Sequence, residues 1–452
     1  MSAPLRDPMA ILRSRSYVGL LVFAAILGVP ISAVAYGFLA LVSKLQEWVF
    51  TDLPQALGFS GTPRWWPLPL LAVAGVLVAL AIRHLPGNGG HSPADGFKAA
   101  GAPPPVELPG IAAAALVTLS LGVVLGPEAP LIALGAGLGG LAVRLARRDA
   151  PAQATAVVAA AGSFAAISTL LGSPLLGAFL LMETSGLGGP ALGLVLVPGL
   201  VAAGIGSLIF LGLDNWTGLG TFSLALPDLP PFGHPNIGQF GWALVIGLVA
   251  AVVGTGIHQL ALALRPHVER RMLLATPLVG LAVGALAVIY ATVTGHDVSN
   301  VLFSGQDAMG PLVANSADYS VAALVLLVAC KGLAYGASMS GFRGGPVFPA
   351  MFLGAAGGVA LSHLPGLPLV AGVAIGIGAM SVAMLKLPLT SVLLATLLLG
   401  SDGLAVMPLV IVAVAVAYVA TARLTPAPAP DTAPATAGPA EAPARPSRTP
   451  GP

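Results

Sequence analysis

Long runs of apolar residues, separated by short polar segments, make up most of the chain. Most are about as long as the 17 to 25 residues that a helix needs to cross the hydrocarbon core of a bilayer. The runs lie near residues 16–43, 66–82, 107–124, 189–213, 236–264, 272–293, 320–336 and 404–422. The pattern predicts an all-α polytopic membrane protein. Further apolar stretches are too short, or too interrupted by Gly and Pro, to span a bilayer as one straight helix.

The composition excludes a soluble protein. Of the 452 residues, 56% are hydrophobic and 8% are charged, and the mean hydropathy is +0.94. A soluble domain carries about a quarter charged residues. The single cysteine, Cys330, excludes an internal disulfide and a cysteine-based metal site. We expect the lipid bilayer to be the surroundings of the chain, with no cofactor and no nucleic-acid partner.

The arginines predict the orientation in the membrane. They gather in four segments, which contain Arg6, Arg13 and Arg15; Arg144, Arg147 and Arg148; Arg265, Arg270 and Arg271; and Arg423. Loops rich in Lys and Arg stay on the cytoplasmic side. Segments 214–240 and 295–319 contain Asp but no Lys or Arg, which suits the opposite side. We therefore expect a multi-pass protein of the cell (inner or plasma) membrane with both termini in the cytoplasm.

The two ends of the chain differ from its middle. No early stretch has the short apolar core and small-residue cleavage site of a signal peptide, so the first run is interpreted as a helix. Residues 1–15 are expected to form a cytoplasmic N-terminus. Residues 424–452 are rich in Pro and Ala and have no apolar face to bury, which predicts a disordered cytoplasmic tail.

An internal repeat divides the remaining chain. The stretch "GPEAPLIALGAGLGGLAVRL" from residue 126 aligns without gaps to "GPVFPAMFLGAAGGVALSHL" from residue 345, with eight of twenty positions identical. Chance would give roughly two in so biased a composition. A second pair follows at nearly the same offset, "SPLLGAFLLMETSG" from 173 and "LPLTSVLLATLLLG" from 387. We expect transmembrane repeats at 16–215 and 216–423.

Gly and Pro begin the repeated stretch in both halves. Duplicated halves with Gly/Pro-interrupted segments indicate a transporter whose broken helices meet near the membrane midplane. Pro in a first helical turn costs no hydrogen bond, and the free N–H groups and helix dipole there attract an anion. The glycines that follow, in "LGAGLGG" and "LGAAGG", are also explained by close helix packing.

Glu128 stands at one of these helix starts. An ionised carboxylate at membrane depth is costly unless it faces a cavity or a partner. It is therefore either a working residue or one half of an ion pair with Lys or Arg inside the bundle.

These motifs resemble those of the CLC family of chloride channels and anion/proton antiporters. "GPEAP" at 126–130 is similar to the family's G-x-E-G-P, and "GGPVFP" at 344–349, with Lys331 upstream, is similar to its G-G-x-F-x-P. "GGHSP" at 89–93 is similar to its G-S-G-I-P. The resemblance covers roughly residues 16–423. It implies two inverted-topology repeats of tilted and broken helices, in a homodimer with a pore in each subunit.

The resemblance also assigns site residues. Glu128 matches the gating glutamate, which competes with anions for a site and takes up protons. The backbone amides of Val347 and Phe348 match those that hold the anion. The whole set of anion-binding positions that it implies is Gly90, His91, Ser92, Gly126, Pro127, Ala129, Gly345, Pro346, Val347 and Phe348.

Several positions depart from the family pattern. Pro127 replaces an Arg, Ala129 a Gly, and Val347 the motif Phe. The serine that binds the central anion aligns with Gly90; a shifted alignment offers Asn88 or Ser92 instead. No segment after Arg423 resembles the last helix of the family, which carries an anion-contacting tyrosine, and Tyr418 belongs to the preceding helix.

The stretch "SPLLGAFLLME" resembles the segment that leads to the proton-relay glutamate of the family. That position is Thr184 here, and Glu183 comes one residue earlier. Thr cannot relay a proton by titrating. Glu183 is either a substitute relay or a charge that reaches the interface from a helix end.

These observations predict transport of a small monovalent anion, first of all chloride, by a voltage- or pH-gated channel or by an antiporter that also moves protons. A fluoride-selective antiporter is the alternative. An intramembrane hydrolase using His91, Ser92 and Asp95 is a remote one, because sequence neighbours rarely reach one another as catalysis requires. We therefore do not expect an enzyme. Selectivity depends on pore geometry, which no motif specifies.

Overall fold

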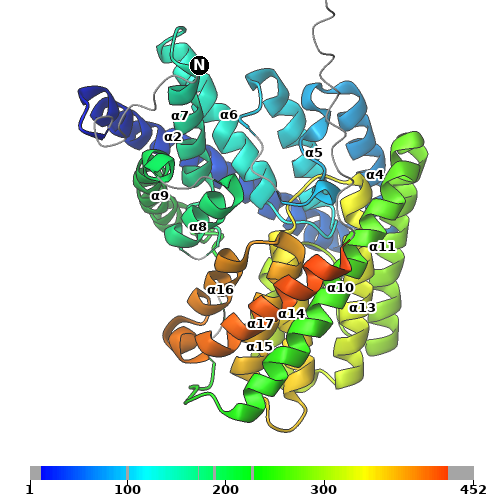
Figure 1. Cartoon of the computed structure of the whole chain (residues 1–452). Helices are drawn as coiled ribbons and strands as arrows, with labels where there is room; N and C mark the ends of the chain where they lie inside the picture. The colour runs from blue at the N-terminus through cyan, green and yellow to red at the C-terminus, as the bar shows by residue number, and fades with distance from the viewer. Residues whose placement is uncertain are drawn as a thin grey trace, which may run out of the picture.

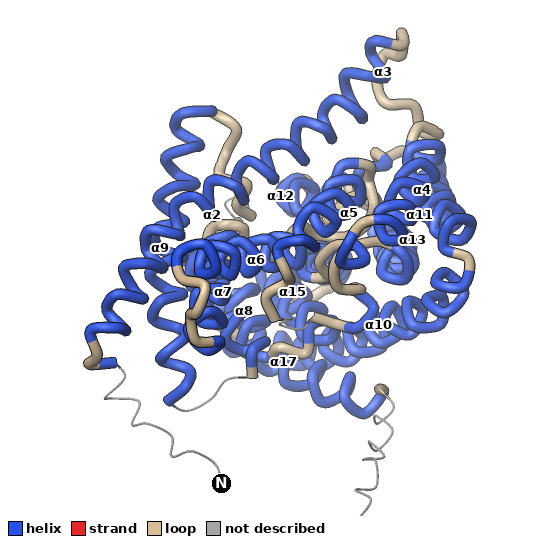
Figure 2. The backbone as a smooth tube through the Cα atoms, turned by 90° about the horizontal axis from the view of Figure 1, so that it is seen from above, coloured by secondary structure: helices blue, strands red, loops and turns tan. Residues whose placement is uncertain are grey.

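The computed structural model describes residues 12–97, 101–171, 173–186, 190–224, 226 and 229–425. These residues form helices and connecting loops, without a β-strand (Figure 1, Figure 2). The helices of the first half are α2 (Arg15–Glu47), α3 (Leu53–Ala56), α4 (Pro67–His84), α5 (Leu108–Ser120), α6 (Glu128–Ala146), α7 (Ala152–Ala166), α8 (Pro174–Ser185) and α9 (Pro190–Thr217). Those of the second half are α10 (Ile237–Arg270), α11 (Met272–Thr294), α12 (Gln306–Ala314), α13 (Val321–Gly341), α14 (Val347–Ser362), α15 (Leu369–Leu385), α16 (Pro388–Leu397) and α17 (Gly403–Leu424).

Eight helical segments in the described residues are long and apolar enough to cross a membrane. Seven of them coincide with predicted runs. The first joins α2 to a π-helical turn, η1 (Trp48–Asp52), and to α3, and covers 42 residues. At 1.5 Å per residue that is about 60 Å, twice the hydrocarbon thickness of a bilayer. This segment must therefore tilt strongly or project from the membrane.

The predicted span at 107–124 was wrong. The helix α5 has 13 residues and ends at Ser120, because Gly122 adopts a positive φ of 93° that turns the chain. The next residues, Val123 to Leu125, are buried without being helical. Conversely α6, which no predicted run covered, is long enough to span. An apolar stretch has the same composition whether it continues a helix or leaves it, so hydropathy missed the break.

The two halves repeat the same packing pattern. In the first half α2 packs on α7 and α9, α6 on α7, and α7 on α9. In the second half α10 packs on α15 and α17, α14 on α15, and α15 on α17. Figures 1 and 2 agree in placing α9 on the side of the molecule opposite α4 and α11, while the long helix α2 runs across the molecule. The sequence repeat at 126 and 345 is thus a repeat of tertiary structure.

Glycines of the repeated stretch lie where two helices touch. A Cβ atom at Gly135 of α6 would be 2.4 Å from the Gly162 carbonyl oxygen of α7. At the aligned Gly354 of α14 it would be 2.3 Å from the Gly376 carbonyl oxygen of α15. Both distances are far below van der Waals contact. Close helix packing therefore explains these glycines, alongside the helix start that the preceding Gly-Pro provides.

The expected tail at 424–452 lies outside the described residues beyond Thr425, and so does most of the expected N-terminal segment at 1–15. The cytoplasmic location of both remains a prediction.

Substituting a contact glycine should loosen the packing of α14 on α15. A Cβ at Gly358 would lie 2.1 Å from the Gly372 carbonyl oxygen, whereas one at the adjacent Gly357 would meet no atom within 4 Å. We expect Gly358→Ala to lower the free energy of unfolding by about 1–3 kcal/mol, the cost of overpacking. Thermal unfolding in detergent measures it, with Gly357→Ala as the matched control. Equal midpoints for the two variants would contradict this packing.

Candidate anion-transport site

Two helix starts, one from each repeat, meet inside the protein. The helix α6 begins at Glu128, directly after Gly126 and Pro127, and α14 begins at Val347, directly after Gly345 and Pro346. The Gly126 amide donates to the Gly345 carbonyl at 2.8 Å, and the Gly345 amide donates back to the Gly126 carbonyl at 2.6 Å. This reciprocal pair holds the two N-termini together.

The Glu128 side chain, which belongs to the start of α6, lies at the N-terminus of α14. It is fully buried, and its Oε1 accepts a hydrogen bond from the Val347 amide. Oε2 is buried and has no hydrogen-bond partner of ordinary geometry. Free amides and the positive end of a helix dipole attract any anion, so the carboxylate occupies a place where an anion would bind.

The two aligned glycines leave the space that this carboxylate fills. A Cβ at Gly126 would be 2.1 Å from Glu128 Oε2, and one at Gly345 would be 2.2 Å from its Cδ. Any other residue at either position would push the side chain away. None of the ion pairs among the described residues includes Glu128, so the structure does not support the alternative of an ion-pair partner.

Two buried residues of α13 form polar contacts with α14 or with residues 300–303, and the sequence analysis gave neither a role. The Tyr335 hydroxyl donates to the Pro346 carbonyl at 2.8 Å, at the start of α14. Lys331 Nζ donates to the carbonyls of residues 300–303 at 3.0–3.4 Å and lies 4.3 Å from the Phe352 ring centroid. The four-residue spacing of Lys331 and Tyr335 places them on one helix face, which was the available signal.

A cavity of about 450 Å³ reaches this junction. Gly90, His91 and Thr184 line it, together with Ala129 and Pro346 at the two helix starts. Gly126, Pro127, Gly345, Val347 and Phe348 do not line it and are buried; Ser92 does not line it either and is partly exposed. Four of the ten expected anion positions, Gly90, His91, Ala129 and Pro346, thus line the cavity, and the role of all ten remains a prediction.

The segment "GGHSP" lies in a loop rather than at the start of a full helix. It contributes only two short 3₁₀ turns, η2 (Pro86–Gly89) and η3 (Pro93–Asp95). Residues 87–90 all have positive φ, which Gly adopts readily and which Asn88 tolerates. Gly90 brings no hydroxyl to the cavity.

Glu183 and Thr184 have different surroundings. The Glu183 carboxylate accepts from the Leu389 amide at 3.0 Å, and from the Thr390 amide and hydroxyl at 2.7 and 2.6 Å. It thereby caps the N-terminus of α16 from α8, where the helix dipole favours a negative charge. The Thr184 hydroxyl donates to Leu180 of its own helix at 2.5 Å. Neither of the two expected roles for Glu183, relay or interfacial charge, included this cap.

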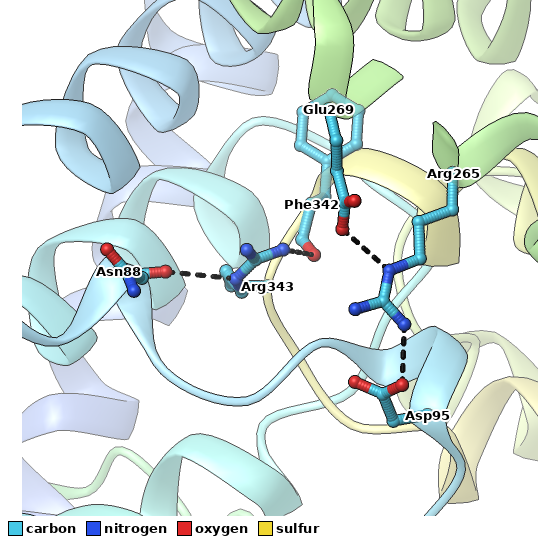
Figure 3. Close-up of polar contacts among 6 residues, drawn as sticks. All are labelled: Asn88, Asp95, Arg265, Glu269, Phe342 and Arg343. Carbon is cyan, nitrogen blue, oxygen red and sulfur yellow. Dashed lines mark hydrogen bonds and ion pairs between the residues drawn. The ribbon is translucent and has the colours of Figure 1, made fainter. Parts of the chain in front are cut away.

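The remote hydrolase trio does not assemble. Asp95 pairs with Arg265 of α10 at 2.5 Å. Its backbone amide donates to the Ser92 carbonyl at 3.1 Å, but no side-chain hydrogen bond or ion pair among the described residues joins it to His91 or Ser92. Arg265 also binds Glu269 at 2.6 Å, and nearby Arg343 donates to the Asn88 and Phe342 carbonyls (Figure 3).

Tyr418, on α17, is 41% exposed.

Comparison with known proteins identifies the family. A family model described as "Voltage gated chloride channel" matches residues 96–422, well over half of the chain. The chain belongs to the voltage-gated chloride channel (CLC) family. The resemblance expected from the three motifs is therefore confirmed.

Relatives and solved structures agree with this CLC membership. Two relatives carry the name ion-transport protein YfeO, one from Escherichia coli O1:K1 / APEC and one from Escherichia coli strain SE11. Each is 31% identical to this chain over 373 residues, which cover 79% of this chain and 82% of the relative. The structure is similar to that of a slow cyanobacterial Cl⁻/H⁺ antiporter, with a TM-score of 0.71, 20% identity and coverage of 90% of this chain and 94% of that one.

A CLC-type fluoride/proton antiporter is also similar, with a TM-score of 0.62, 19% identity and coverage of 89% of this chain and 95% of that one. At these identities the likeness shows the fold. The protein has the CLC fold of two inverted-topology repeats of tilted and broken helices, as expected.

Removing the Glu183 carboxylate should destabilise the α8–α16 contact. We expect Glu183→Ala to lower the free energy of unfolding by about 1 kcal/mol, because a lost helix cap leaves backbone amides unpaired. Thr184→Ala, the neighbouring control, should change it little. Thermal unfolding in detergent compares the two. Unchanged stability of Glu183→Ala together with lost proton coupling would instead make Glu183 a relay.

Proposed function

We propose that this CLC protein conducts chloride through a pore gated by Glu128. CLC-type anion transport follows from the family; the anion, the gate and the mechanism are our proposal. We further propose that it forms a homodimer in the cell membrane, with one pore in each subunit.

The observation that carries the proposal is the hydrogen bond from the Val347 amide to the Glu128 carboxylate at the start of α14. An ionised Glu128 fills the place where these amides would hold chloride. A protonated, neutral Glu128 is attracted far less by the helix dipole and leaves the place free. The conducted anion and the proton thus compete through one side chain, and anion flux should rise as the pH falls.

The surroundings of Glu183 and Thr184 favour a channel over an antiporter. Exchange needs a second group that passes protons to Glu128 from the other side. Glu183 is engaged by three donors of α16, and Thr184 does not titrate.

An antiporter is the second candidate, because two titratable residues, His91 and Glu107, line the cavity that leads to Ala129. The likeness to the chloride/proton and fluoride/proton antiporters also supports it, and makes fluoride the alternative anion.

Glu128 variants test the gate. In liposomes, Glu128→Gln and Glu128→Ala should give chloride efflux that no longer depends on pH, with any proton coupling abolished. The wild-type protein should slow as the pH rises. Folding is checked by size-exclusion chromatography. A folded Glu128→Ala variant whose efflux still depends on pH would show that another residue is the gate.

The same liposomes separate the alternatives. Chloride efflux that is independent of an imposed proton gradient supports a channel. Proton movement driven by a chloride gradient supports an antiporter, and the same movement driven only by fluoride supports the fluoride-selective form.

The topology is tested by cysteine labelling in a Cys330→Ala background. Single cysteines at Arg148 and Arg271 should react only from the cytoplasmic side, because both lie in arginine-rich segments. A cysteine at Ser316 should react only from outside. Labelling of position 148 from outside would overturn the orientation.

A further inference from the structure

Arg343 is a charged residue directly before the motif "GGPVFP" at 344–349. It has no role in the site as described so far. It lies between α13 and α14, two residues before Gly345, and is half-buried. Its side chain lines the cavity of about 450 Å³, together with Gly344 and Pro346. The cavity thus has a guanidinium in its wall, close to the start of α14.

The guanidinium is held in place from several sides. Its Nε donates to the Asn88 carbonyl and its Nη1 to the Phe342 carbonyl, both at 3.2 Å (Figure 3). Its Cγ packs against Gly89, where a Cβ would come within 3.3 Å of it. The orientation of the planar group is therefore largely fixed before any ligand arrives.

Both of these partners are neutral. No ion pair among the described residues includes Arg343, although Glu107 lines the same cavity. The neighbouring Arg265, by contrast, is paired with both Asp95 and Glu269. Two of the five N–H donors of Arg343 bind carbonyls, which leaves the others for a ligand. Arg265 is thus directly paired with two carboxylates, whereas the nearby Arg343 feels Glu269 and Asp95 only at longer range and has no direct ion pair among the described residues.

The shape of a guanidinium selects among anions. Its parallel N–H groups match the two oxygens of a planar oxyanion, while a spherical halide gains no such bidentate fit. The rest of the cavity wall is largely Gly, Ala and Pro, and Gly90 supplies no hydroxyl. A cavity of this volume accommodates a polyatomic anion as easily as chloride.

We propose that Arg343 is a specificity-determining residue that makes this pore prefer small planar oxyanions, of the nitrate and formate class, over halides. The proposal rests on the proposed anion transport and refines its substrate class. The guanidinium binds the oxyanion in the cavity before it reaches the amides of Val347 and Phe348.

Competition in liposomes tests the preference. Uptake of radiolabelled chloride is measured with potassium nitrate or potassium bromide as competitor. Bromide is spherical and, like nitrate, less strongly hydrated than chloride, so it controls for dehydration. We expect nitrate to compete roughly tenfold better than bromide with the wild-type protein, the effect of about one charge-assisted hydrogen bond. With Arg343→Lys, which keeps the charge and loses the fork, the two should compete about equally.

A second variant controls for the loop. Arg265→Lys perturbs the other anchor of residues 87–96 and leaves Arg343 in place, so its nitrate preference should match the wild type. Loss of the preference in Arg265→Lys, or its survival in Arg343→Lys, would assign Arg343 a purely structural role and overturn the proposal.

Binding is measured separately from transport. Potassium nitrate should raise the thermal unfolding midpoint of the detergent-solubilised protein more than potassium bromide does, because a ligand stabilises the state that binds it. The difference should vanish in Arg343→Lys or, if that variant does not fold, in Arg343→Gln. Absence of chloride uptake in wild-type liposomes would refute the proposed function. Equal stabilisation of the wild-type protein by the two salts would refute the role of Arg343.

Discussion

The contact between the Glu128 carboxylate and the first amide of α14 is the constraint on which the rest of the structure depends. A buried carboxylate without a cationic partner is costly in a membrane protein, and helix-start amides are among the few groups that offset the cost. Both helix starts must therefore meet. The reciprocal bonds between Gly126 and Gly345 keep them together, and the missing Cβ atoms of these glycines leave room for the side chain.

The internal repeat provides two similar helix starts, and a sequence difference between them gives each a different part in the contact. Glu128 and Val347 occupy equivalent positions in the two repeats, so the first repeat provides the acid and the second provides the amide that binds it. The glycines that pack α6 on α7 and α14 on α15 kept their role in both halves. Tyr335 binds the Pro346 carbonyl at the start of α14, so the backbone that carries the amides is held by a buried hydrogen bond. A fixed donor and a releasable acid are what the proposed gate requires.

The loop at residues 87–96 lines the cavity together with the two helix starts. Its positive-φ residues are anchored by Arg343 at one end, and its Asp95 is anchored by Arg265 of α10 at the other (Figure 3). The family position that supplies a hydroxyl aligns with Gly90, or with Asn88 or Ser92 in a shifted alignment, and Arg343 is a nearby guanidinium whose side chain is anchored. Differences in anion preference within one fold can arise from such exchanges, because selectivity depends on the donors that line a pore.

The sequence alone determined the membrane character, the repeat, the family and the position of Glu128. Each of these depends on local composition or on short motifs, and hydropathy and Gly-Pro helix starts are local properties. Prediction from the sequence failed where contacts between distant segments determine the structure. The span at 107–124 breaks at Gly122, Glu183 caps a helix two hundred residues away, and Arg343 and Tyr335 gain roles only from carbonyls and a cavity built by other segments. Hydrogen-bond partners of buried polar groups are set by packing across the fold, which no local pattern encodes.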